Sequence, residues 1–136
     1  MSTRSFAMMF GIVFLAVGIA GFVPALTSAP EGGAMNMHAP DMVMLLGMFP
    51  VNMYHNAVHI LFGLWGLAAS RSAAGALTYA RGVAIIYALL TVLGLIPATE
   101  TLMGMVPLNG NDIWLHGLLA VVAAYFGWVN RSPVTA

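Results

Sequence analysis

The chain has 136 residues, of which 61% are hydrophobic and only 6% are charged, and its formal net charge is zero. A soluble domain carries about 25% charged residues, so this composition excludes an ordinary soluble protein and predicts one that is embedded in lipid. The zero net charge provides no basic surface for nucleic acid. The absence of cysteine excludes disulfides, thiolate metal sites and thiol catalysis.

Four apolar segments are long enough to cross a bilayer as helices, which takes about 17 to 25 residues. They cover residues 6–26, 54–70, 78–98 and 113–129. The sequence therefore predicts an all-α fold, a four-transmembrane-helix bundle that forms a single integral membrane domain over residues 1–136. An outer loop, residues 27–53, joins the first two helices, and its apolar run Met42 to Leu46 predicts a short helix.

A motif occurs twice, each time at the start of a long apolar segment. The first copy runs from Pro50 to His59 and the second from Pro107 to His116. The preceding segments also end alike, in Gly21-Phe22-Val23-Pro24 and Gly94-Leu95-Ile96-Pro97. These correspondences predict two tandem helix-loop-helix repeats that have the same orientation in the membrane.

The charged residues predict how the chain is oriented. The arginines are Arg4, Arg71, Arg81 and Arg131, and the acidic residues are Glu31, Asp41, Glu100 and Asp112. If all four segments cross the membrane, all the arginines lie on one side of it and all the acidic residues on the other. By the positive-inside rule, both termini are cytoplasmic and the motif loops are extracytoplasmic, in the cell inner (plasma) membrane.

The asparagines of the motif predict helix starts. Asn52 and Asn109 follow a proline and precede an apolar helix, which is typical of N-cap residues. Asn56, in the first copy of the motif, is predicted to have the same structural role in capping. Capping accounts for these side chains without any ligand.

His59 and His116 lie about one turn deeper than a capping position requires. His55 and His59, spaced i and i+4, share one helix face, and Asp112 and His116 have the same spacing on the last helix. Three imidazoles and a carboxylate suit zinc, copper or iron. His59 and His116 could instead be the two axial ligands of a haem. A third interpretation is a polar network that only specifies packing and contains no cofactor.

Methionines are frequent in the first outer loop. Thioethers suit Cu(I), so the run from Met35 to His38 could capture copper, but methionine also fills gaps between packed helices. The packing role is the preferred interpretation of this loop.

The two motif copies carry a family resemblance. The chain resembles, over nearly its whole length, a prokaryotic family of small four-helix membrane proteins known as domain of unknown function 4383. Members often have a proline before the His-Asn pair and a second asparagine after the motif aspartate, where this chain has Met53 and Ile113. The resemblance implies the fold and the membrane location, and it implies no activity.

The sequence leads to two functional hypotheses. The first is a structural or accessory subunit with an outward His/Asp/Asn cluster, which contacts lipid and associates with itself or with a larger membrane complex. Small residues on the first helix, such as Gly11 and Gly18, would provide the contact surface. The second is a metal- or haem-binding membrane protein that uses the histidine motifs. Hydrolytic catalysis is not expected, because Ser70 and Ser72 are predicted across the membrane from these histidines.

Overall fold

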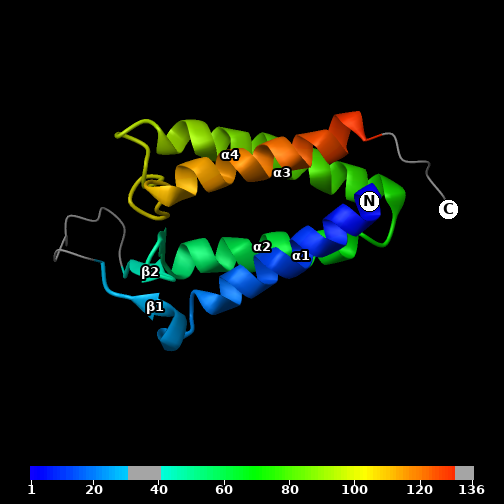
Figure 1. Cartoon of the computed structure of the whole chain (residues 1–136). Coiled ribbons are helices and arrows are strands. Elements are labelled where there is room, and N and C mark those ends of the chain that lie inside the picture. The colour runs from blue at the N-terminus through cyan, green and yellow to red at the C-terminus, as the bar shows by residue number, and fades with distance from the viewer. Residues whose placement is uncertain (31–40, 131–136) are drawn as a thin grey trace.

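The protein consists of two antiparallel helical hairpins that lie side by side, as the computed structural model shows (Figure 1). The structure describes residues 1–30 and 41–130. The helices are α1 (Thr3–Ala20), α2 (Met53–Ala69), α3 (Ala73–Gly94) and α4 (Asn111–Ala124), and α4 continues as a π-helix, η3 (Tyr125–Val129). In the described residues, α1 packs mainly on α2, and α3 packs mainly on α4.

Three of the helices begin at a polar residue that caps the first turn. The side chains of Ser2, Asn52 and Ser72 each accept a hydrogen bond from a backbone N–H three residues later. These bonds satisfy amide groups that have no partner inside the helix. The cap at Ser72 also explains why α3 begins at Ala73, five residues before the predicted start.

The long helices end earlier than predicted. The first was expected to reach residue 26 but ends at Ala20, and the third was expected to reach residue 98 but ends at Gly94. Prolines follow both ends, and a proline lacks the N–H that would continue the helix. Pro24 begins a short 3-10 helix, η1 (Pro24–Leu26), instead.

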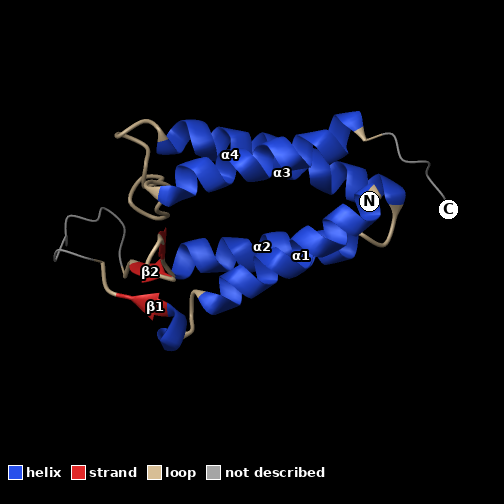
Figure 2. Cartoon of the chain, in the orientation of Figure 1, coloured by secondary structure: helices blue, strands red, loops and turns tan. Residues whose placement is uncertain are grey.

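A small antiparallel sheet lies beside the start of α2, so the prediction of an all-α chain is corrected to a mostly helical one (Figure 2). It comprises β1 (Thr27–Ser28), β2 (Val43–Leu45) and β3 (Phe49–Val51), in the order β1-β2-β3. The predicted short helix at residues 42–46 is wrong, because Val43 pairs with Val51 across a tight hairpin. Leu46 and Gly47 have the positive φ angles of 53° and 68° that this reversal requires.

Glycines bring α1 and α2 into close contact. A Cβ atom on Gly11 would lie 2.8 Å from the backbone nitrogen of Leu67, and one on Gly66 would lie 2.8 Å from the Ala7 carbonyl oxygen. Gly18 is likewise packed against the backbone of Asn56. The glycines of α1 therefore form a contact within the chain, and they are not a free surface for a partner as the sequence had suggested.

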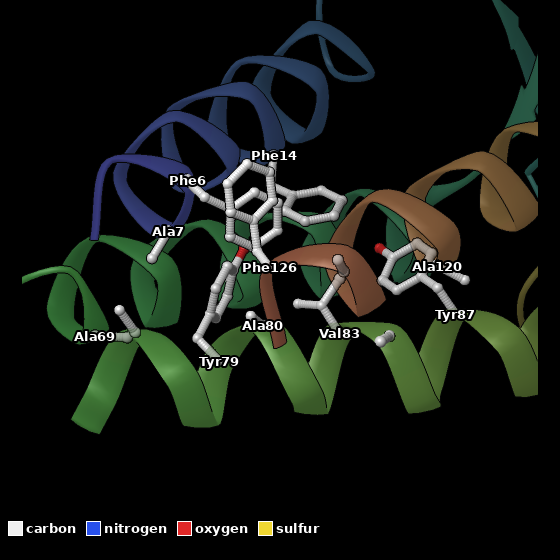
Figure 3. Close-up of a cluster of buried hydrophobic side chains, with 13 residues drawn as sticks. Phe6, Ala7, Phe14, Ala69, Tyr79, Ala80, Val83, Tyr87, Ala120 and Phe126 are labelled. Atoms are coloured by element: carbon white, nitrogen blue, oxygen red, sulfur yellow. The ribbon is translucent and has the colours of Figure 1, made fainter. Parts of the chain in front are cut away.

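An aromatic core joins the two hairpins, and Figure 3 shows it between α1, α3 and the end of α4. Phe6 stacks on Phe126 with ring centroids 4.6 Å apart, and Phe14 lies 5.4 Å from Tyr87. These side chains are almost completely buried. Their burial provides the main apolar contact between the hairpins in the described part of the chain.

Polar contacts fix the end of the molecule where α1 begins, here called the arginine end. Arg4 donates to the carbonyl of Ser70 (3.0 Å), and Asn130 donates to that of Met1 (3.1 Å). The last carbonyl groups of a helix have no partner inside it. Arg81 donates to one of these, the Gly127 carbonyl, at 2.9 Å. The starts of α2 and α4 lie at the opposite end, here called the motif end (Figure 1).

Three helices are long and apolar enough to cross a membrane: α1, α3 and the continuous helix Asn111–Val129. This count refers to the described residues alone. Helix α2 has 17 residues, the lower limit of a spanning helix. The composition and these helices are consistent with an integral membrane protein.

Candidate functional site

The first part of the site lies on α2 at the motif end. The Asn52 side chain accepts a hydrogen bond from the backbone N–H of His55 (2.9 Å), so the predicted cap at Asn52 is confirmed. His55 and His59 follow on the inward face of the helix, and each is at most 6% exposed. His59 lies about 9 Å along the axis from the first helical residue, Met53.

The second part lies on α4, where the predicted cap is wrong. Gly110 is the N-cap residue, and the structure records no side-chain hydrogen bond at this cap. Gly110 has a φ of 63°, which turns the chain so that the helix begins only at Asn111. Asn109 therefore lies outside the helix start. Asp112 and His116 still face the interior, and both are at most 2% exposed.

Asn56 does not cap a helix either, because it lies inside α2, one turn after Asn52. Its side chain is buried and lies directly against Gly21, where an added Cβ atom would overlap the Asn56 amide group. Gly21 thus provides the space that the Asn56 side chain occupies. The role of Asn56 is to pack the end of α1 against α2.

The structure brings three of the predicted ligands together. One ring nitrogen from each of His55, His59 and His116 lies within 4.8 Å of the other two. Tetrahedral zinc holds its nitrogens at about 2.0 to 2.1 Å, so two of them are about 3.4 Å apart. Small movements of the rings would therefore bring these three nitrogens to coordination distance. We call His55, His59 and His116 the histidine triad.

Asp112 lies at the edge of the triad. Its Oδ2 atom is 3.9 Å from Nε2 of His55, which is longer than a hydrogen bond. The Pro50 carbonyl also lies near His55, outside hydrogen-bonding geometry. Asp112 is therefore close enough to act either as a fourth ligand or as the counter-charge of a bound cation.

Six buried polar atoms of the site have no hydrogen-bond partner among the described residues. Both nitrogens of His55, both of His59, Nδ1 of His116 and Oδ2 of Asp112 are buried and make no hydrogen bond. More than about 90% of buried polar groups in proteins are paired, because an unpaired group costs about 1 to 3 kcal/mol. Six such atoms lie together in this one cluster.

Aromatic rings surround the triad on the inner side. The Phe14 ring meets His59 edge-on at 5.3 Å, and the Tyr87 ring meets His116 edge-on at 5.1 Å. These contacts restrict rotation of the two imidazoles and keep the surroundings apolar. Sequence reasoning did not find either aromatic residue, since only the tertiary structure brings α1 and α3 to the site.

Two asparagines connect the loops that cover the motif end. The Asn52 amide donates to the carbonyl of Met105 (2.7 Å), and the Asn111 amide donates to that of Met48 (3.0 Å). Each bond runs from one hairpin to the loop of the other. Sequence analysis had not assigned a role to Asn111, although its place in the second motif copy was a signal.

The copper-capturing alternative at Met35, Met37 and His38 lies outside the described residues.

No curated protein and no solved structure matches the chain. The family model described as "Domain of unknown function (DUF4383)" matches residues 4–129, which confirms the resemblance seen in the sequence. The chain belongs to the DUF4383 family.

Proposed function

We propose that this protein is an integral membrane protein that binds one divalent transition-metal ion through His55, His59 and His116. The observation that carries the proposal is the triad itself: three buried ring nitrogens within 4.8 Å of one another, in a cluster with six polar atoms that have no hydrogen-bond partner. Neutral imidazole suits zinc, copper and iron. Asp112 supplies a negative charge that offsets part of the charge of the ion.

The competing hypothesis is a structural or accessory subunit, in which the cluster only packs, within a self-associated or larger membrane complex. A network that serves packing stabilises the fold when its members pair with one another, and a partly satisfied network is destabilising. The triad makes no internal hydrogen bond in the described residues. This observation favours the metal hypothesis over the packing hypothesis.

A single ion fits the site better than a haem. A haem bound by His59 and His116 would have to lie between their rings. His55 reaches the same point, with its ring centroid 4.5 Å from that of His59 and 6.3 Å from that of His116. A porphyrin would overlap the His55 side chain, whereas one ion can use all three imidazoles.

Elemental analysis of the detergent-purified protein tests the proposal. We expect about one equivalent of zinc, copper or iron per chain after the protein is supplied with these ions. The double variant His59→Ala, His116→Ala should lose it, since one imidazole is not enough to hold the ion. Leu118→Ala, which shortens an exposed side chain of the same helix, should bind as much metal as the wild type.

Failure to bind metal in the folded wild-type protein would overturn the proposal and favour the accessory-subunit hypothesis. Equal metal content in the wild type and the double variant would place the metal elsewhere. A haem absorption spectrum that depends on His59 and His116 would favour the haem alternative.

We also propose that all four helices cross the membrane as two tandem repeats, with the arginine end in the cytoplasm. Arg4, Arg71 and Arg81 lie towards one end and Glu100 and Asp112 towards the other, which supports this orientation. Since the chain contains no cysteine, single cysteines can report the topology. A cysteine at Ser72 should react with an impermeant maleimide only after cells are permeabilised, and one at Met103 should react in intact cells. The reverse pattern would contradict the orientation.

A further inference from the structure

Asp112 is the only Asp, Glu, Lys or Arg side chain that is buried among the described residues. It is 1% exposed, and its Oδ2 atom makes no hydrogen bond there. Acidic side chains are rarely buried without a partner, because removing a charge from water is costly. Asp112 also lies in the first turn of a helix that is long and apolar enough to cross a membrane. A carboxylate in this position needs a positive charge close to it.

Basic side chains of the described residues do not provide that charge. The sequence contains no lysine, and the described arginines, Arg4, Arg71 and Arg81, lie towards the arginine end. Arg81 donates to the Gly127 carbonyl, which is about 22 Å from Asp112 along the axis of the same helix. The start of α4 carries a partial positive charge, but its effect is smaller than the cost of burying a full negative charge.

The histidine triad lies directly beside the carboxylate. Oδ2 of Asp112 is 3.9 Å from Nε2 of His55, and this is the only ion pair of Asp112 within residues 1–30 and 41–130. A neutral imidazole brings no charge, whereas a metal ion bound to it does. His55 also contributes one of the three ring nitrogens that lie within 4.8 Å of one another. An ion held by the triad would therefore lie close to the Asp112 carboxylate.

The attraction between a carboxylate and a cation is proportional to the charge of the cation. At the same position, Asp112 therefore stabilises a divalent ion about twice as much as a monovalent ion. Little of this difference is lost to screening, because the site is buried and the rings of Phe14 and Tyr87 meet the triad edge-on. The three imidazoles are neutral ligands, so Asp112 is the member of the site that distinguishes ions by charge.

We propose that Asp112 determines which ions the histidine triad accepts, by favouring a divalent ion over a monovalent ion. This inference rests on the proposed metal site and assigns its selectivity to one residue. The same preference follows whether the carboxylate touches the ion or acts through His55, because in both cases it places one negative charge beside the ion. A merely structural role of Asp112 at the start of α4 would not distinguish between ions.

Copper provides the test, because Cu²⁺ and Cu⁺ are ions of the same element that differ by one charge. Asp112→Asn keeps the shape of the side chain and removes its charge, so folding should be preserved. We expect this variant to lose about 100-fold in Cu²⁺ affinity and about tenfold in Cu⁺ affinity. The midpoint potential of the bound copper reports the ratio of the two affinities, and it should rise by about 59 mV. Competition with chelators measures the affinities, and spectroelectrochemistry measures the potential.

Glu100→Gln is the matched control, because it makes the same change from carboxylate to amide in the loop between α3 and α4. Its copper affinities and midpoint potential should equal those of the wild type. Asp112→Glu keeps the charge, so it should keep the preference for Cu²⁺. An equally large rise in potential in Glu100→Gln would show that the total charge of the protein sets the preference, and it would overturn the proposal.

Two further outcomes separate this proposal from the metal site on which it rests. If Asp112→Asn loses affinity equally for Cu²⁺ and Cu⁺, or for neither, the selectivity proposal is overturned while copper binding by the wild type still supports the triad. A folded wild-type protein that binds neither ion would refute the triad, and the selectivity proposal with it.

Discussion

Replacing Gly66 by alanine is expected to destabilise the protein by about 2 to 3 kcal/mol, because the added methyl group has no space between α1 and α2. It would lie 2.8 Å from the Ala7 carbonyl oxygen, 2.8 Å from Cα of Gly11 and 2.9 Å from the Tyr79 ring. Two of these atoms belong to the backbone, so the helices must move apart, and overpacking of this kind typically costs 1 to 3 kcal/mol. Thermal or denaturant unfolding in detergent measures the loss.

The matched control is Gly117→Ala on α4. A methyl group there would meet Thr91 at 3.6 Å, an ordinary contact distance. The substitution should be neutral or stabilise the protein by about 0.5 to 1 kcal/mol, because alanine favours the helix over glycine. Equal effects of the two substitutions would show that the close contact between α1 and α2 does not determine stability.

Zinc at 100 times its dissociation constant is expected to stabilise the wild-type protein by about 2.7 kcal/mol, which follows from binding to the folded state alone. His59→Ala should remove most of this gain. His59 and His55 lie on α2 and His116 on α4, so the ion would connect the two hairpins at the motif end. The measurement is the unfolding temperature with zinc and with a chelator, for the wild type and the variant.

Leu118→Ala provides the control, because it shortens an exposed side chain on the helix that carries His116. Its unfolding temperature should rise with zinc as much as that of the wild type. An equal rise in His59→Ala would show that zinc binds outside the triad. If His59→Ala is more stable than the wild type in the absence of metal, that result would agree with the proposal. The substitution removes two buried ring nitrogens that have no hydrogen-bond partner.

The sequence predicted helices correctly where a single apolar pattern ran long enough to dominate. The prediction failed at short segments and at helix ends. The short apolar run from Met42 to Leu46 is compatible with either a helix or a strand. Only its pairing with residues 49–51 selects the strand. Asn109 has the right residue type for a cap, but Gly110 is the N-cap residue, so α4 begins one residue later than a cap at Asn109 would place it.

Composition and spacing by themselves predicted a helical membrane protein, and they placed the histidines on the inner faces of two helices. These properties depend on local periodicity and on the cost of placing charge in lipid, both of which can be read along the chain. Only the tertiary structure decided that His55, His59 and His116 meet in one cluster, because their distance depends on how the two hairpins pack. It also decided that Gly11 and Gly18 serve the contact between α1 and α2, since a stripe of small residues suits a partner inside the chain as well as one outside it.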